Sequence, residues 1–340
     1  MESTVAVVAA IICTFTSFSV FKWSSLINIS KNNTTGVRFA SQTKPVFGGF
    51  IFLAGCISGI TTQYFIYNEF KIFYYLLPLS IAFISGLADD LKNTPPGFKL
   101  VTQIITGVSF YITGLMPQYF GSTVIDLSIC IVWTVTLMNS LNMLDNMDSI
   151  TSCTSLVILL ATIFSSVILG NNYHSISLAV ALSISLLIFL YTNWHPAKMY
   201  MGDNGSQIIG AALSIITLQA FSPESPLQTT NSLFALFGLI IALIIPLTDT
   251  ATVSINRIMA GKSPFVGDKN HITHNLFYLG IPIRSIAYIF IILTSVTNLF
   301  AICIAKRYIS SNYILWATIG FIILISLILY STTKIKKPVR

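Results

Sequence analysis

The chain has 340 residues, of which 54% are hydrophobic and only 9% are charged, and its mean hydropathy is +0.80. This composition excludes a water-soluble globular protein, and it leaves no room for a separate soluble domain beside a polytopic membrane domain. The net charge of +7 does not call for a nucleic-acid partner, because basic residues gather near the anionic inner face of a membrane.

Long apolar stretches follow one another along the chain, and each can cross a hydrocarbon core of ~30 Å as a helix. The first has no basic residues before it and begins near Glu2, so a cleaved signal peptide is not expected. The sequence therefore predicts an all-α integral membrane protein, with residues 1–340 as one polytopic domain. About eleven transmembrane helices are expected, near 4–21, 46–66, 72–88, 101–116, 123–139, 152–169, 176–192, 204–221, 232–248, 284–305 and 313–330.

An odd number of spans puts the two termini on opposite sides of the membrane. With the N-terminus outside and the C-terminus in the cytosol, all basic residues except Lys71, Lys306 and Arg307 fall on the cytosolic side, as the positive-inside rule requires. The same orientation gathers the cytosolic loops 38–49, 86–103, 139–151, 193–210 and 249–280. Those loops carry most of the aspartates, namely Asp89, Asp90, Asp145, Asp148, Asp203, Asp249 and Asp268.

The first two of these loops combine basic and acidic residues. Lys44 stands before a proline and a glycine pair, which would suit an anion at a helix N-terminus or simply an ordinary turn. Asp89 and Asp90 are adjacent, and neighbouring carboxylates stay ionised at low cost only beside a cation. A hard divalent ion such as Mg²⁺, with phosphate as a further ligand, is the natural partner. Lys99, one turn into the next helix, favours phosphate.

The third and fourth loops add amides and further carboxylates. Asn142, Asp145 and Asp148 recur at a spacing of three, which brings them onto adjoining faces of a helix end. Such groups can read hydroxyls or a nucleobase edge, or they can form a satisfied polar network between helices. The fourth loop begins at Asn193 and contains the run 202–206, in which two glycines flank Asp203. Glycines let the backbone approach a ligand at the start of a helix.

The fifth loop is the longest and contains histidines as well as charge. His271 and His274 are three residues apart and lie downstream of Arg257 and Asp268. Two ligands do not make a zinc site without a third, so phosphate contacts are expected of these residues. His174 and His195 are interpreted as structural residues, and the five cysteines, which form no CxxC pair, as packing residues.

Together these motifs resemble one family, the polyprenyl-phosphate N-acetylhexosamine-1-phosphate transferases, in its bacterial undecaprenyl-phosphate GlcNAc-1-phosphate transferase-like branch of glycosyltransferase family 4. The resemblance covers roughly residues 38–280 and rests on five motifs in order. The first two motifs are Lys44-Pro45 with Gly48-Gly49, and Asp89-Asp90 with Lys99. The third is the block of Asn142, Asp145 and Asp148. The fourth is Pro196-Ala197-Lys198 with Gly202-Asp203 and Gly205-Ser206, and the fifth is the loop of Asp268, His271 and His274.

The resemblance implies a Mg²⁺-dependent phosphosugar transfer, with Mn²⁺ as an alternative ion. An oxygen of undecaprenyl phosphate attacks the β-phosphorus of a UDP-N-acetylhexosamine, UDP-GlcNAc by default, and UMP leaves. Attack is either direct or through an aspartyl phosphate. Of the residues that match the family motifs, Asp203, Asp89 and Asp90 are expected to serve catalysis and the metal. Asn142, Asp145 and Asp148 are expected to bind the nucleoside side, and the phosphates are expected to meet Lys44, Lys99, Arg257, His271 and His274. Asn193 is expected to bind substrate as well.

The resemblance further implies a multi-pass protein of the bacterial cytoplasmic (inner) membrane, with a cytosolic active site that begins cell-envelope glycan synthesis. Its partners are the two substrates and membrane lipid, without nucleic acid, and a homodimer is left open. The chain departs from the family pattern at three positions. Asn146 and Ser149 stand where glycines are common, and Thr273 stands where a further histidine is usual.

Three alternatives are weighed. A phospho-N-acetylmuramoyl-pentapeptide transferase would typically carry a Pro-x-His-His-His-Phe-Glu stretch, which is absent from this sequence. An aspartate-rich intramembrane prenyltransferase would need a second acidic position after Asp89-Asp90, where Asn93 stands. A secondary transporter should show internal symmetry and ionisable residues near mid-membrane, whereas these aspartates cluster at helix ends.

Overall fold

The computed structural model of the chain describes residues 15–20, 22, 44–169, 175–222, 232–263, 270–305 and 312–335. Within them, the regular elements are helices, and a single isolated bridge joins Val46 to Tyr200. This confirms the expected all-α class. The helices are α2 (Gly48–Tyr67), η1 (Phe70–Tyr75), α3 (Leu76–Lys92), α4 (Pro96–Ile112), α5 (Thr123–Leu144), α6 (Ile150–Leu169), α7 (Ile176–Asn193), α8 (Gly202–Ala220), α9 (Ser232–Ala242), α10 (Ile244–Met259), α11 (Ile272–Tyr278), α12 (Ile283–Ala305) and α13 (Asn312–Thr332).

The described helices include several that are long and apolar enough to cross a bilayer, as expected of an integral membrane protein. Five meet this test alone, at Gly48–Tyr67, Phe70–Lys92, Thr123–Leu144, Ile176–Asn193 and Ile283–Ile304, and a bent pair gives a sixth. The apolar helices Ile150–Ser166 and Trp316–Thr332 are shorter. The expected span at 4–21 falls largely outside the described residues. The total of eleven spans and the side on which each terminus lies stay predictions.

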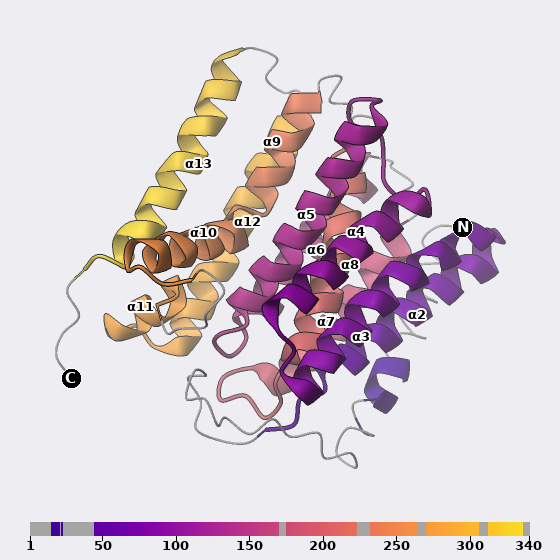
Figure 1. Ribbon diagram of the computed structural model, residues 1–340, viewed down its shortest axis with the longest axis horizontal. Coiled ribbons are helices and arrows are strands. Elements are labelled where there is room, and N and C mark those ends of the chain that lie inside the picture. Colours follow the sequence, from indigo (N-terminus) through magenta and orange to yellow (C-terminus); the bar gives the residue numbers. More distant parts are fainter. Residues whose placement is uncertain are drawn as a thin grey trace.

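Helix α8 forms the centre of the bundle. It packs against α3, α5 and α2, and nearly all its side chains are buried (Figure 1). The contact with α3 depends on Gly86, because a Cβ there would lie 2.4 Å from the carbonyl oxygen of Asp203. Small residues let helix backbones approach this closely in membrane proteins. The first turn of α8, which carries Asp203, is therefore pressed against the end of α3, which carries Asp89 and Asp90.

The stretch expected to form one span at 232–248 is not one continuous helix, and its single crossing of the membrane stays a prediction. Helices α9 and α10 meet at an angle of 75° around Leu243. Pro246 has no N–H to donate to the carbonyl of Ala242, and its ring would clash with that carbonyl in a continuous helix. The side chain of Asn298 in α12 donates to the Ala242 oxygen instead, at 3.0 Å. As a result α10 runs across the lower ends of α9 and α13 (Figure 1).

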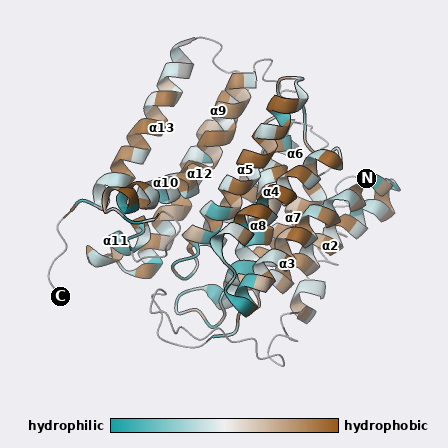
Figure 2. Cartoon of the chain, viewed as in Figure 1, coloured by the Kyte–Doolittle hydropathy of each residue, from teal (hydrophilic) through white to brown (hydrophobic). Residues whose placement is uncertain are grey.

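The polar loops gather at one end of the bundle, where α3, α5 and α7 end and α4, α6 and α8 begin. Hydrophilic residues concentrate there and around α11 (Figure 2). Side-chain hydrogen bonds join the loops in pairs: Lys99 bonds Asp203, Asn142 bonds Ser206, and Asp148 bonds His195. The expectation that these motifs share one face of the protein is therefore confirmed for the part of the chain that is described.

Candidate active site

A cluster of two carboxylates and one ammonium lies where α3, α4 and α8 meet. Helix α3 ends at Asn93, whose left-handed backbone reverses the chain, and Pro96 starts α4. This tight turn brings Lys99 back beside Asp89. The Lys99 Nζ lies 2.7 Å from Asp89 Oδ2 and 2.9 Å from Asp203 Oδ2. Two charged groups of the second loop, Asp89 and Lys99, thus meet Asp203 of the fourth loop at one point in space.

The electrostatics of this cluster keep Lys99 charged. Burial by itself disfavours the ammonium, but the two carboxylates outweigh it and raise the pKa of Lys99 above its ordinary value. The other oxygen of Asp89 accepts hydrogen bonds from the backbone and hydroxyl of Thr94, at 2.8 and 2.7 Å. Burial and the neighbouring Asp203 carboxylate raise the pKa of Asp89 above its ordinary value, so a further cation at this point would stabilise the charged form of both carboxylates.

Asp90 points the other way and holds the start of α8. Its two oxygens accept the backbone N–H groups of Asp203 and Asn204, at 3.1 and 2.9 Å. A carboxylate at this position satisfies N–H groups that a helix N-terminus leaves without partners, and it matches the positive end of the helix dipole. Gly202 allows the approach, since its φ is +76° and a Cβ there would lie 2.1 Å from Val46 Cγ1. The adjacent aspartates therefore have different partners.

The cluster offers part of a donor set for a divalent cation. No group of three or more His, Cys, Asp or Glu side chains is arranged as a metal site in the described residues. Two carboxylate oxygens, from Asp89 and Asp203, nevertheless converge on one cationic atom. Mg²⁺ is commonly held by one or two carboxylates together with substrate phosphates and water. Asp89 and Asp203 fit that pattern, and Lys99 Nζ occupies the point on which they converge.

The first and fourth loops run side by side and connect this cluster to a neighbouring cavity. The N–H of Tyr200 donates to the carbonyl of Pro45, and the N–H of Gly49 donates to the side-chain oxygen of Asn204 at 3.0 Å. The Lys44 Nζ lies 5.1 Å from the centre of the Tyr200 ring, a cation–π distance. Because Tyr200 and Asp203 are three residues apart, the cavity and the acidic cluster are fixed relative to each other.

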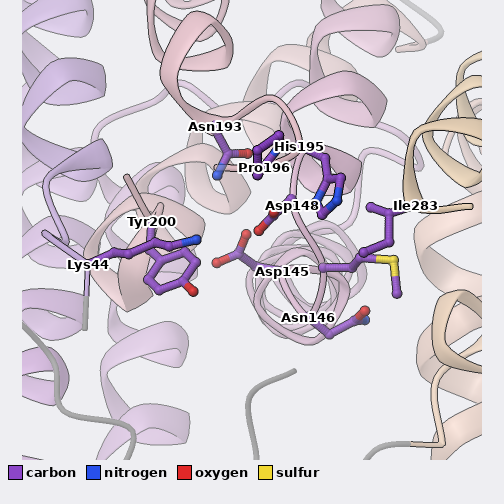
Figure 3. A pocket seen from close by; sticks show the side chains of 10 residues that line it. Lys44, Asp145, Asn146, Asp148, Asn193, His195, Pro196, Tyr200 and Ile283 are labelled. Carbon is purple, nitrogen blue, oxygen red and sulfur yellow. Dashed lines mark hydrogen bonds and ion pairs between the residues drawn. The ribbon is translucent and has the colours of Figure 1, made fainter. Parts of the chain in front are cut away.

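The cavity itself has a volume of about 180 Å³ and a mixed polar and apolar lining (Figure 3). Figure 3 shows Asp145 and Asp148 from the third loop facing the same space as Lys44 and Tyr200. The predicted residues Lys44, Asp145, Asp148 and Asn193 are thus brought together. The full lining is Lys44, Asp145, Asn146, Met147, Asp148, Asn193, His195, Pro196, Tyr200 and Ile283.

Two polar side chains hold the walls of this cavity together. Asp148 accepts hydrogen bonds on one oxygen from His195 Nδ1, at 2.8 Å, and from the backbone of Ala197, at 3.0 Å. Asn193 accepts from the backbone of Ser149 at 3.0 Å and donates to the carbonyl of Met199 at 3.0 Å. The third and fourth loops are therefore held to each other by several hydrogen bonds.

Two predicted residues, Asn142 and Arg257, lie outside the cavity lining. Asn142 donates to the hydroxyl of Ser206 at 2.9 Å, which ties the third loop to the first turn of α8. Arg257 is buried in α10. Asn142 and Arg257 are absent from the cavity lining, so their assignment to substrate stays a prediction.

The histidines of the fifth loop lie on α11, held by α10. The Nδ1 of His271 and the N–H of Ile272 both bond the buried carboxylate of Asp249, at 2.8 and 2.9 Å. The rings of His271 and His274 are nearly perpendicular, with centroids 5.5 Å apart. The predicted pair is therefore adjacent, and His271, the residue just before α11, is bonded to α10. Asp268 lies outside the described residues.

The sequence interpretation missed three contributors to the site. His195, taken as structural, lines the cavity and bonds Asp148. Tyr200 was not singled out, although its place between the motif residues Lys198 and Gly202 was a usable signal. Asp249 was counted among the loop aspartates, but its bond to His271 joins residues 22 positions apart and leaves no local pattern.

Comparisons with known proteins agree with the resemblance drawn from the motifs. Residues 72–221 match the pattern of glycosyl transferase family 4. A "Probable undecaprenyl-phosphate N-acetylglucosaminyl 1-phosphate transferase" of Bacillus subtilis is 28% identical over 258 residues, which is 73% of this chain and 70% of that protein. The resemblance to this family is therefore confirmed.

Two further relatives show the breadth of the match. A "Decaprenyl-phosphate N-acetylglucosaminephosphotransferase" of Mycobacterium leprae is 29% identical over 57% of this chain, and the aligned part spans 55% of the mycobacterial protein. A "Phospho-N-acetylmuramoyl-pentapeptide-transferase" of Dictyoglomus thermophilum is 29% identical over 53% of this chain and 61% of its own length. Relatives with either type of name thus align with the chain.

Proposed function

We propose that this chain, whose residues 72–221 match glycosyl transferase family 4, transfers N-acetylglucosamine 1-phosphate from UDP-GlcNAc to undecaprenyl phosphate and releases UMP. The observation that carries the proposal is the direct connection of an acidic cluster to a cavity lined by carboxylate, amide and aromatic groups. The first suits a diphosphate with its cation, and the second suits a nucleoside. The names of the Bacillus and mycobacterial relatives describe this type of transfer.

The cavity is assigned to the uridine of the donor. Tyr200 offers an aromatic face on which a base can stack, and Lys44 lies over the same ring, close enough to reach the adjoining phosphate. One oxygen of Asp148 is committed to His195 and Ala197. We assign the other to the imide N–H of uracil, which an ionised carboxylate accepts with a charge-assisted bond. Asp145 is assigned to the ribose hydroxyls.

The reaction replaces one phosphoanhydride by another. An oxygen of the lipid phosphate forms a bond to the β-phosphorus of the donor, the bond from that phosphorus to the bridging oxygen breaks, and UMP leaves with the electron pair. Little covalent chemistry is required, so alignment and charge neutralisation account for most of the catalysis. Lys99 is placed to neutralise developing phosphate charge beside Asp203. Arg257, His271 and His274 are proposed as further phosphate contacts.

Mg²⁺ is the proposed cofactor, held by Asp89 and Asp203 together with the donor phosphates, where it would neutralise the diphosphate. Asp90 is proposed to act first through α8, because its oxygens fix the backbone of Asp203 and Asn204. Asp203 is then presented at the N-terminus of a helix that other groups hold in place. In this proposal Asp89 and Asp203 supply the negative charge that holds the cation, and Asp90 fixes the position of the helix that carries Asp203.

The setting proposed for this reaction is the bacterial cytoplasmic membrane, with the site open to the cytosol. The apolar helices of the bundle support a multi-pass protein, and the distribution of basic residues supports the orientation. The undecaprenyl tail would lie along the membrane-facing helices, with its phosphate at the interface beside the acidic cluster.

Release of UMP from UDP-GlcNAc, with and without undecaprenyl phosphate, tests the proposal. We expect release only with the lipid and with Mg²⁺. Inside-out membrane vesicles should be active without detergent, whereas right-side-out vesicles should need permeabilisation, because UDP-sugars do not cross the bilayer. A donor panel with UDP-GalNAc and UDP-MurNAc-pentapeptide sets the specificity. Preference for the pentapeptide donor would refute the assignment of the sugar, and lipid-independent release would refute the acceptor.

A further inference from the structure

Two of the residues that depart from the family pattern are in contact with each other. Asn146, in the turn between α5 and α6, and Thr273, in the first turn of α11, lie 127 positions apart in the sequence. The hydroxyl of Thr273 donates to the side-chain oxygen of Asn146 at 2.5 Å. Thr273 is fully buried and Asn146 is partly buried, so this bond is partly shielded from competing water.

Both polar atoms of the Asn146 side-chain amide form hydrogen bonds. Its oxygen accepts from Thr273, and its nitrogen donates to the carbonyl of Met143 at 2.9 Å. Asn146 also lines the cavity beside Asp145 and Asp148 (Figure 3). A side chain with both polar ends occupied is a fixed part of the cavity wall, and it transmits the position of α11 to the two aspartates next to it.

Helix α11 is held equally firmly on its other side. The carboxylate of Asp249 bonds both His271 and the backbone of Ile272, and the side chain of Asn275 donates to the carbonyl of His271 at 2.8 Å. Thr273 lies between the two histidines in sequence. A shift at Thr273 therefore moves His271 and His274 together relative to the cavity.

We propose that Asn146 and Thr273 are positioning residues, whose bond sets the place of His271 and His274 relative to the nucleotide cavity. This inference rests on the proposed function, because it assumes that the cavity holds the donor and that the histidines meet its phosphates. Asn146 contributes to the wall of that cavity, whereas Thr273 is buried and is absent from the lining. Their bond couples the binding of the nucleotide to the alignment of the transferring phosphate.

A double-mutant cycle tests the proposal. Thr273→Val keeps the shape of the side chain and removes the hydroxyl, Asn146→Ala removes the acceptor, and the double variant removes both. We expect kcat with UDP-GlcNAc to fall about tenfold in each single variant, as for one lost hydrogen bond in a preorganised site, and the double variant to fall no further. The KM for UDP-GlcNAc should change less than the kcat, because Lys44, Asp148 and Tyr200 are intact.

Two controls separate positioning from general stability. Thr273→Ser keeps the hydroxyl and should keep kcat near the wild-type value. Thr134→Val removes a buried hydroxyl that faces Ser214 across α5 and α8, away from the cavity, and should lower the melting temperature without lowering kcat.

The outcomes are distinct. Wild-type kcat in Thr273→Val, even with a lower melting temperature, would overturn the positioning role, as would additive losses in the cycle. Failure of the proposed function would instead appear in the wild-type protein, as an absence of UMP release with every UDP-sugar tried, and it would overturn the inference together with its premise. Non-additive losses in kcat across the cycle, together with a near wild-type kcat in Thr273→Ser, support the positioning role.

Discussion

The acidic cluster and the nucleotide cavity lie next to each other but are built from different interactions. In the cluster, Asp89 and Asp203 share the ammonium of Lys99, which sits at the end of a flexible side chain. In the cavity, Asp148 and Asn193 bond an imidazole, an amide N–H and a backbone carbonyl on neighbouring loops. One region holds charges whose partner can move away, and the other holds loops in a fixed arrangement.

The difference matches the two tasks proposed for the regions. A site that receives a diphosphate and its cation must release and regain charge, and a mobile lysine can give way to both. A site that recognises a nucleoside gains from preorganisation, because groups that are already in place lose no conformational entropy on binding. Substitutions in the two regions should therefore affect different kinetic constants.

The largest effect is expected for Asp203→Asn in the cluster. The substitution is nearly isosteric and removes one charge, so folding should survive while turnover falls on the order of 10²- to 10³-fold at saturating substrate and Mg²⁺. The measurement is kcat for UMP release. Asp126→Asn is the matched control. Asp126 lies on α5, away from the cluster, and its carboxylate accepts a hydrogen bond from the backbone N–H of Phe120. Full activity of Asp203→Asn in assays with excess Mg²⁺ would contradict the role of Asp203 as the principal charged ligand of the cation.

A smaller and different effect is expected for His195→Phe in the cavity. Loss of the bond to Asp148 leaves that carboxylate held only by the backbone of Ala197. The KM for UDP-GlcNAc should rise about two- to tenfold, the usual range for one hydrogen bond, with kcat little changed. His195→Asn, whose amide can donate in place of Nδ1, should recover part of the loss. A fall in kcat at constant KM would contradict the assignment of the cavity to binding.

The smallest effect is expected for Ser149→Gly in the frame of the cavity. Ser149 has a φ of +71°, a left-handed conformation that costs roughly 1–2 kcal/mol for a residue with a Cβ. Its hydroxyl donates to the carbonyl of Asn193 at 3.0 Å, a bond worth about 1 kcal/mol. Glycine loses the bond and relieves the strain, so the melting temperature should stay close to the wild-type value.

Ser149→Ala is the comparison that isolates the strain. It loses the same hydrogen bond but keeps the unfavourable backbone, and it should therefore melt at a lower temperature than the glycine variant. Equal melting temperatures for the two would show that the left-handed backbone at Ser149 carries no cost.

Much of the site could be predicted from the sequence because its motifs are local. The pairing of Asp89 and Asp90, the glycines around Asp203 and the spacing of Asn142, Asp145 and Asp148 are visible within a few residues, and the hydropathy pattern placed them at helix ends. The break between α9 and α10 was missed, although Pro246 marked it. The length of an apolar run indicates that a segment can be buried in lipid, but it does not indicate whether the helix axis changes direction within that segment.

The sequence by itself determined the composition of the site, that is, which carboxylates, amides and cations lie at the polar ends of apolar helices. Only the tertiary structure decided what each group does there. Asp89 and Asp90 are neighbours with the same chemistry, yet Asp89 shares Lys99 with Asp203 while Asp90 caps the helix that carries Asp203. The physical reason is that each role depends on a donor that another part of the chain supplies. Its distance and direction arise from helix packing, and residue type does not encode them.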